Sequence, residues 1–394
     1  MTSAAVSHRP ISVALGGFIA LAVAMGIGRF VYTPILPFMA EGLGLTKGEA
    51  GLIASANFLG YLLGALGASS AALPGGRRAW AIAALAVSAL STGIMGLSSS
   101  LPVFLVLRFI GGVASAFALV FASALVLDRL TAAGRPALIA LYFAGVGSGI
   151  VLSALLVAGL AAAGYDWRVF WLASGALSLL GLGAVVRLVP GMAEVKPAAA
   201  AQRGGPIDRR LRALIAAYGL FGFGYVITAT FISTIVRSSP DLQSLEPVVW
   251  LIVGLAAIPS VAIWAWVGRR IGNGRGFAIA CVAEAAGVTL SVLATQPPVV
   301  ATAAVLLGGT FVGITATGLV NARELSTADP RRSLALMTAI FGVGQMIGPT
   351  FAGFVHDLSG NFRLPSLAAA AALVIAAALV GATASGPAAA RRRC

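Results

Sequence analysis

The chain has 394 residues, of which 59% are hydrophobic and 10% are charged, and its net charge is +14. Soluble globular proteins carry about 25% charged residues, so this composition excludes a water-soluble fold and indicates a protein embedded in lipid. The basic residues stand in short gaps between apolar segments, a pattern typical of membrane topology and not of a nucleic-acid-binding surface.

Twelve segments are apolar and long enough to span a bilayer, which takes about 20 residues. The first follows His8 and Arg9 without a clear cleavage site, so we interpret it as a retained span and not as a signal peptide. In chain order the expected helices cover residues 12–39, 48–72, 79–98, 101–127, 136–163, 167–188, 211–236, 247–267, 276–295, 298–321, 333–356 and 364–384. The sequence therefore predicts an all-α, multi-pass membrane protein.

The distribution of basic residues over the gaps predicts how these helices are oriented. Of the 26 Lys and Arg residues, 20 fall on the side of the two termini, four fall on the other side, and Arg29 and Arg108 fall inside spans. Basic residues are retained on the cytoplasmic side of a membrane. We therefore expect an even number of helices, both termini in the cytoplasm and a location in a bacterial inner membrane.

The two halves of the chain resemble each other at an offset of about 196 residues. Three glycine pairs of the first half recur in order in the second: Gly26 and Gly28 match Gly222 and Gly224, Gly111 and Gly112 match Gly308 and Gly309, and Gly145 and Gly147 match Gly342 and Gly344. Repeats of this kind place a substrate site near the membrane midplane between the halves. We predict a six-helix bundle over 1–189, a cytoplasmic linker over 190–210 and a second six-helix bundle with a short basic tail over 211–394.

Several other function classes lack their signatures. The glycine pairs do not follow a strand, and no phosphate-binding loop occurs, which argues against a dinucleotide enzyme and a nucleotide-driven pump. Cys281 and Cys394 are far apart in the sequence, and His8 and His356 are the only histidines. We expect no enzymatic activity, no cofactor, no metal site and a monomer in the lipid bilayer.

Five segments carry a resemblance to a known family: Met25–Met39, Ser55–Gly64, Phe121–Asp128, Tyr218–Thr230 and Met337–Gln345. On these segments the chain resembles the major facilitator superfamily of transporters, and specifically its YbfB/YjiJ family, over about residues 11–384. The resemblance implies twelve transmembrane helices in two pseudo-symmetric six-helix bundles. It also implies secondary transport by alternating access, with helices 1, 4, 7 and 10 around a central cavity.

The cytoplasmic motifs of the superfamily are only partly present. Of the motif between helices 2 and 3, Gly76, Arg77 and Arg78 are present without the preceding Asp, and the loop after helix 8 lacks that Asp too. Other acidic residues are then needed as partners for the arginines of a cytoplasmic gate. The residues expected at this gate are Arg77, Arg78, Asp128, Arg129, Arg269, Arg270 and Glu324.

Arg29 and Arg108 are the basic residues that lie well inside spans. A buried charge costs about 2.5–3.5 kcal/mol on insertion scales and therefore faces a cavity or a partner. A guanidinium in the cavity can bind a carboxylate through two parallel hydrogen bonds, which indicates a small organic anion as the solute. The alternative is that Arg108 bonds to backbone carbonyls of helix 1 and stabilises one conformational state.

Other polar residues inside the spans are further candidates. A buried carboxyl exchanges protons near neutral pH more readily than an exposed one, so Glu284 is a candidate for proton coupling, although helix 9 is peripheral in the family fold. Each of the remaining candidates has a purely structural alternative, a hydrogen bond between helices. The candidates for substrate binding besides the two arginines are Tyr32, Asn57, Tyr142, Tyr225 and Gln345.

The sequence thus favours a transporter of a small organic solute, with an organic anion and proton coupling as the specific hypothesis. Two alternatives remain open at this stage. One is an efflux antiporter for drugs or metabolites, and the other is a non-transporting receptor or scaffold that retains the fold.

Overall fold

The computed structural model describes residues 10–70, 73–135, 137–189, 207–326 and 330–384. Within these ranges all regular secondary structure is helical. Most of the expected linker, the basic tail and His8, Arg9 and Cys394 lie outside the described residues.

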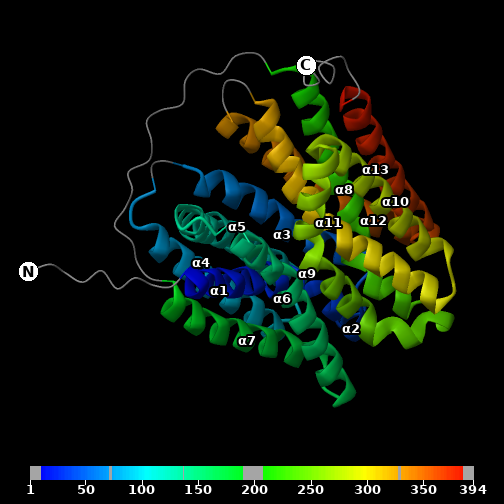
Figure 1. Ribbon diagram of the computed structural model, residues 1–394. Coiled ribbons are helices and arrows are strands. Elements are labelled where there is room, and N and C mark those ends of the chain that lie inside the picture. Colours follow the sequence, from blue (N-terminus) through cyan, green and yellow to red (C-terminus); the bar gives the residue numbers. More distant parts are fainter. Residues whose placement is uncertain (1–9, 71–72, 136, 190–206, 327–329, 385–394) are drawn as a thin grey trace, which may run out of the picture.

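The first half runs from α1 to α7 (Figure 1). Their bounds are α1 Pro10–Leu21, the π-helical segment η1 Ala22–Ile27, α2 Tyr32–Leu43, α3 Lys47–Ala68, α4 Arg77–Ile94, the 3₁₀ turn η2 Met95–Leu97, α5 Leu101–Ala132, α6 Ala137–Ala162 and α7 Trp167–Leu188.

The second half repeats this arrangement from α8 onward. Its elements are α8 Arg209–Arg237, the 3₁₀ turn η3 Pro240–Leu245, α9 Glu246–Ile271, α10 Asn273–Leu293, α11 Pro297–Leu325, α12 Pro330–Ser359 and α13 Arg363–Ala384.

Twelve spans of the described chain are long and apolar enough to cross a membrane. Each predicted span is confirmed, and its helix ends lie within about five residues of the expected positions. The first span differs in one respect, because η1 and a turn interrupt it between α1 and α2. The predicted span over 12–39 is therefore present, but it is not one regular α-helix: Gly26 and Gly28 lie at this interruption, and Pro34 supplies no backbone N–H to continue the hydrogen-bond ladder across it.

Contacts between helices divide into those within each half and those between halves. In the first half α5 packs on α3 and α4, and α1 packs on α6; in the second half α8 packs on α12 and α13, and α11 packs on α9 and α10. The halves meet where α3 packs on α12, α6 on α9 and α2 on α8. Figure 1 shows the two groups of helices side by side, with α1–α7 in blue to green and α8–α13 in green to red.

Close glycine contacts relate the two halves residue by residue. A Cβ atom at Gly112 would overlap the carbonyl oxygen of Asn57, and a Cβ atom at Gly308 would overlap the carbonyl oxygen of Val253. Both partners are displaced by the same 196 positions. The contacts therefore match Gly112 with Gly308, one residue away from the match with Gly309 that the sequence suggested.

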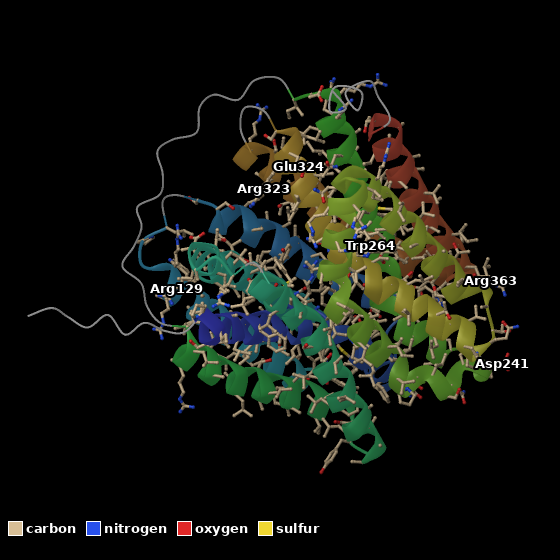
Figure 2. The ribbon with its side chains drawn as sticks, viewed as in Figure 1. Arg129, Asp241, Trp264, Arg323, Glu324 and Arg363 are labelled. Atoms are coloured by element: carbon tan, nitrogen blue, oxygen red, sulfur yellow. The ribbon has the colours of Figure 1, made fainter. Side chains whose placement is uncertain are left out.

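The bundle has two chemically different ends. The end that carries Arg77, Arg129, Arg209 and Arg323 is called the basic end below, and the end with Glu41, Arg168, Arg237 and Arg363 is called the opposite end. Figure 2 labels Arg129, Arg323 and Glu324 at the basic end, and Asp241 and Arg363 at the opposite end.

Candidate functional site

Arg108 contacts the backbone at the interruption of the first span. It projects from α5 and is buried, and its Nη1 and Nη2 atoms donate to the carbonyl oxygens of Gly28 and Arg29 at 3.1 Å each. Tyr32 and Trp171 face the same guanidinium with their rings. Arg108 therefore stabilises an irregular backbone inside the bundle, where unpaired carbonyls are costly. This geometry corresponds to the structural alternative considered for Arg108 from the sequence.

Arg29 lies at that interruption and has a different environment. Its side chain is 4% exposed, and its guanidinium carbon lies 4.4 Å from the ring centre of Tyr61, 4.7 Å from that of Phe58 and 5.4 Å from that of Phe30. Nε and Nη2 of Arg29 have no hydrogen-bond partner among the described residues. Cation–π contacts offset only part of the cost of burying this charge. Arg29 therefore presents unsatisfied donors between the two halves.

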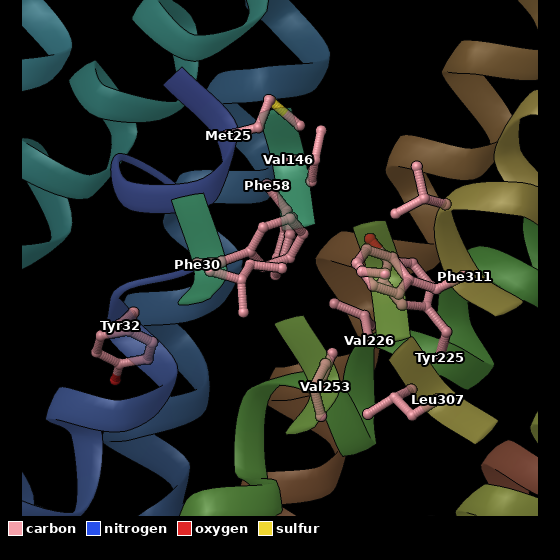
Figure 3. Close-up of a cluster of buried hydrophobic side chains, with 14 of the residues drawn as sticks. Met25, Phe30, Tyr32, Phe58, Val146, Tyr225, Val226, Val253, Leu307 and Phe311 are labelled. Carbon is pink, nitrogen blue, oxygen red and sulfur yellow. The ribbon is translucent and has the colours of Figure 1, made fainter. Parts of the chain in front are cut away.

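Tyr225 occupies the position in the second half that corresponds to Arg29. Its ring stacks on Phe311 and Phe341 with centroid distances of 5.7 and 5.9 Å, and its hydroxyl accepts a hydrogen bond from Gln345. Phe311 in turn lies 5.7 Å from Phe30 of the first half. Figure 3 shows Phe30 and Phe58 on one side and Tyr225 and Phe311 on the other. Aromatic rings from both halves thus extend from Arg29 toward Tyr225.

The space directly beside Arg29 is small. A void of about 10 Å³ is lined by residues of both halves, among them Arg29, Arg108, Phe58 and Thr230. That volume corresponds to about one water molecule. A group as small as a carboxylate oxygen fits there, and the body of a solute has to lie outside it.

Three of the sequence candidates make hydrogen bonds within the first half. The Tyr32 hydroxyl donates to the carbonyl of Ala50 at 2.8 Å, and Nδ2 of Asn57 donates to the carbonyl of Arg108 at 2.9 Å. The Tyr142 hydroxyl lies 2.7 Å from the Ser123 hydroxyl. These three residues therefore have structural partners within their own half.

Three further candidates lie near the contact between the halves. Arg29 lines the void between them, and Tyr225, with its partner Gln345, stacks on Phe311, which meets Phe30 of the first half. Sequence reasoning missed the aromatic rings that surround them, because aromatic residues in a span are indistinguishable from packing residues. The missed rings are those of Phe30, Phe58 and Phe311.

Glu284 lies on α10, away from the contact between the halves. It is 0% exposed, and both carboxyl oxygens lack a hydrogen-bond partner among the described residues. The helix packs mainly on α11 and α13 of its own half. Glu284 is therefore a buried, unpartnered acid inside the second bundle.

Two polar contacts at the basic end each lie within one half. Arg77 pairs with Asp128 at 3.2 Å, and Nδ2 of Asn273 donates to Glu324 at 2.8 Å. Asn273 and Glu324 stand 196 positions after Arg77 and Asp128, so the same contact occurs twice with Asn in place of Arg. Glu324 is thus paired with Asn273 and not with Arg269 or Arg270.

The other residues expected at the gate have different neighbours. Arg78 donates to the carbonyl oxygens of Val186 and Val189 at the end of α7. The guanidinium of Arg270 lies over the ring of Trp266 at 5.1 Å, Arg269 is exposed, and Arg129 lies in the last turn of α5.

Two sets of polar contacts at the opposite end join the two halves. Arg237 at the end of α8 pairs with Glu41 of α2 and with Glu246 of α9. Asp357 of α12 accepts hydrogen bonds from the backbone N–H groups of Lys47 and Gly48, at 3.0 and 2.7 Å, and thereby caps α3. Sequence reasoning missed these contacts, although Glu41 and Arg237 are opposite charges 196 positions apart.

Contacts nearer the middle also join the halves. Oγ1 of Thr33 donates to the carbonyl of Ala229 at 2.7 Å, and Oγ1 of Thr350 donates to Ser55 at 2.7 Å. In the first span only α2, the part toward the opposite end, packs on α8, whereas α1 packs on α5, α6 and α7 of its own half. The halves are thus held together at the opposite end and diverge toward the basic end.

Comparisons with known proteins give a family and a fold. The sequence model of the family described as "Uncharacterised MFS-type transporter YbfB" matches residues 21–381. A search among curated proteins found no match. The structure is similar to that of a mutant of the nucleoside transporter NupG, with a TM-score of 0.75 and 16% identity over 94% of this chain and 99% of that one. It is also similar to a bacterial homologue of the human lysosomal transporter Spinster in an inward-facing, occupied conformation, with a TM-score of 0.69 and 15% identity over 95% of this chain and 96% of that one.

Proposed function

Because the chain belongs to the YbfB family of major-facilitator-type transporters, we propose that it is a secondary transporter of a small organic anion. In this proposal the two bundles, 1–189 and 211–394, rock about the contacts between them, joined by the linker at 190–210. The observation that carries the choice of an anion is Arg29, a buried cation between the halves with two unsatisfied nitrogen atoms.

The surroundings of Arg29 support an anion with an apolar or aromatic body. The small void beside the guanidinium accepts an oxygen atom, and the rings of Phe58, Tyr61 and Phe311 offer flat apolar surface next to it. Gln345 and the Tyr225 hydroxyl supply polar groups on the other half. Arg108 has a positioning role in this scheme, because its Nη1 and Nη2 atoms hold the carbonyls of Gly28 and Arg29, although its Nε atom has no partner among the described residues and it lines the same void.

The two ends of the bundle support a proposal for the side of the membrane to which the described conformation opens. Basic residues are retained in the cytoplasm, so the basic end is proposed to face the cytoplasm of a bacterial cell, with both termini on that side and the chain in the inner membrane. The halves diverge toward that end, which corresponds to an inward-facing conformation of a monomer. Asp128 with Arg77, and Glu324 with Asn273, are then the polar groups nearest the cytoplasmic gate.

The test begins with a thermal-shift screen of the purified chain against aromatic and aliphatic carboxylates, cationic drugs and nucleosides, the last being the cargo named for NupG. Ligands that bind only the folded state raise its apparent stability. We expect carboxylates to stabilise the chain, and counterflow in proteoliposomes to follow the same ranking. Stabilisation by cationic drugs alone would favour the efflux alternative, and a well-folded chain without binding or counterflow would favour a scaffold.

The Arg29→Lys variant tests the role of Arg29. Lysine keeps the charge but loses the planar fork that bonds a carboxylate twice, so we expect the affinity for the best carboxylate to fall by about 10- to 100-fold, which matches the loss of one hydrogen bond to a charged group. Arg168→Lys, at the opposite end, is the matched control and should leave transport unchanged. Normal carboxylate affinity in Arg29→Lys would remove Arg29 from the binding site.

Proton coupling through Glu284 is the second part of the proposal. A buried carboxyl without a fixed partner can change its protonation state when the surrounding helices move. The Glu284→Gln variant is expected to lose accumulation driven by a pH gradient while it retains exchange of solute for solute. Full accumulation by Glu284→Gln in proteoliposomes would exclude this carboxyl as the coupling group.

A further inference from the structure

A separate cavity lies between the halves at the opposite end. It has a volume of about 250 Å³ and is bounded by α2, α6, α8 and α9, with Pro34, Val157, Ala158, Ser233 and Trp250 among its walls. Arg29 and Arg108 do not line it. The cavity is therefore distinct from the void beside Arg29, and no step of the proposed transport uses it.

The exposure of the wall residues shows where this cavity opens. Ala162 and Pro247 are exposed, whereas Pro34, Ser233 and Trp250 are buried. The exposed pair stands at the end of α6 and the start of α9, which places the mouth at the opposite end of the bundle. A molecule in solution on that side can thus reach the cavity while the halves are held together.

The Ser233 hydroxyl does not make the hydrogen bond to a preceding carbonyl that other serines of the bundle make. Serines elsewhere in the spans, such as Ser174 and Ser238, donate to the carbonyl four residues earlier. For Ser233 that carbonyl belongs to Ala229, and it already accepts a hydrogen bond from Thr33 of the other half. The Ser233 hydroxyl is buried and has no partner among the described residues. A buried hydroxyl without a partner costs free energy that a ligand can recover.

Trp250 provides a second unsatisfied donor in the same wall. Its Nε1 atom is buried and lacks a partner among the described residues. The indoles of Trp80 and Trp264, by comparison, donate to backbone carbonyls at 2.8 Å. Two residues of one small cavity thus carry buried polar groups that are not satisfied by the protein.

We propose that this cavity is a second binding site, which takes a small uncharged molecule with one apolar ring and one hydrogen-bond acceptor. A cavity of about 150 Å³ holds benzene, so 250 Å³ accommodates one ring with a short polar substituent. The acceptor bonds to Ser233 and Trp250. A net charge is not required, because Arg237 and Glu246 at this cavity already pair with each other.

Occupation of this site favours one conformational state. The walls belong to both halves, α2 and α6 on one side and α8 and α9 on the other. If the opposite end opens, these walls separate and the site is lost. A ligand that binds only one state shifts the population toward it, so the bound molecule holds the opposite end closed and inhibits transport. This inference does not depend on Arg29 binding an anion.

The test uses acetophenone and ethylbenzene, two molecules of nearly equal size of which only the first has a carbonyl acceptor. Binding to the chain in lipid nanodiscs is measured by saturation-transfer NMR. Tighter binding of acetophenone than of ethylbenzene is expected. Ser233→Ala should weaken acetophenone binding about five-fold, as expected for one neutral hydrogen bond, and leave ethylbenzene unchanged. Trp250→Phe also makes the cavity wall smaller, so it should weaken acetophenone binding more than ethylbenzene binding. Ala158→Phe, which fills the cavity, should abolish binding of both.

Two results would overturn the proposal. The first is equal binding to the native chain and to Ala158→Phe, which would mean that the probes only partition into lipid. The second is unchanged acetophenone affinity in both Ser233→Ala, which removes one hydroxyl group, and Trp250→Phe, which removes the indole N–H together with part of the ring.

The conformational effect is measured with spin labels at the basic end, on Ala132→Cys and Arg323→Cys in a Cys394→Ser background. Both positions are exposed, lie in different halves and are separate from the cavity, and the remaining Cys281 is buried. Acetophenone should raise the population with a long distance between the labels. An unchanged distance distribution at saturating acetophenone would contradict the state preference of the site.

Discussion

The two ends of the bundle use similar polar residues in opposite ways. At the basic end, Arg77–Asp128 and Asn273–Glu324 each tie a helix to a neighbour within one half. At the opposite end, Glu41–Arg237 and Asp357 with the start of α3 tie one half to the other. Contacts within a half survive when the halves rotate, whereas contacts between halves have to break. In the proposed rocking of the halves, the contacts between halves at the opposite end are therefore ones that have to break, and they contribute to the balance between conformational states.

The largest effect on this balance is expected from Gly353→Val on α12. A Cβ atom at Gly353 would overlap the carbonyl oxygen of Lys47 on α3, and backbone cannot move aside as a side chain does. Overpacking costs about 1–3 kcal/mol, so the closed state of the opposite end should lose population by roughly ten-fold or more. The distance between the labels at Ala132→Cys and Arg323→Cys is expected to shorten.

Gly159→Val is the matched control for this change, because nothing lies within 4 Å of a Cβ atom at Gly159 on α6. It introduces the same side chain into a span without touching the other half. Equal label distances in the Gly353→Val and Gly159→Val proteins would show that the α3–α12 contact does not govern the balance.

A smaller effect is expected from Glu41→Gln, which removes the ion pair between the halves and retains Arg237–Glu246. The Glu41 side chain is 69% exposed, and exposed pairs contribute about 0.2–1 kcal/mol. The balance should therefore shift by at most about five-fold toward the state open at the opposite end. Salt screens exposed pairs, so the label distances of the native chain should respond to ionic strength more than those of Glu41→Gln. An identical salt response would exclude the pair as a contributor.

The smallest effect on the balance is expected from Arg77→Ala at the basic end. Arg77 and Asp128 are 41% and 68% exposed and belong to the same half, so their pair is present in both states. We expect the balance between the states, as read from the label distances, to change by less than about two-fold, with any loss limited to thermal stability. A shift as large as that of Glu41→Gln would mean that the basic end also holds a contact between the halves.

The fold was largely predictable because each span is a long apolar run. In lipid such a run satisfies its backbone hydrogen bonds by forming a helix. The uneven distribution of Lys and Arg between alternate gaps indicated an even number of helices. The bonding of Arg108 to backbone carbonyls of helix 1 was one of the alternatives drawn from the sequence, whereas the break between α1 and α2 at those carbonyls was not expected, because hydropathy shows only the length of an apolar run.

The candidate site was predictable only in part. Arg29 stood out from the sequence, because a charge in a span is rare and costly. Tyr32, Asn57 and Tyr142 are polar in the same way, yet the structure uses them to bond helices of one half. The Glu41–Arg237 and Asp357 contacts depend on which helix ends meet, and hydropathy carries no information on that.

Thr33 meets Ala229 and Glu41 meets Arg237, and in each pair the partners are the same position of the two repeats. An assembly of two identical copies with twofold symmetry would place each such residue against itself. At position 41 that arrangement would set glutamate against glutamate or arginine against arginine, and like charges repel. Joining both copies in one chain removes this constraint, because the residues on the symmetry axis can then differ. The ion pair between Glu41 and Arg237 is thus a contact that two identical copies could not form.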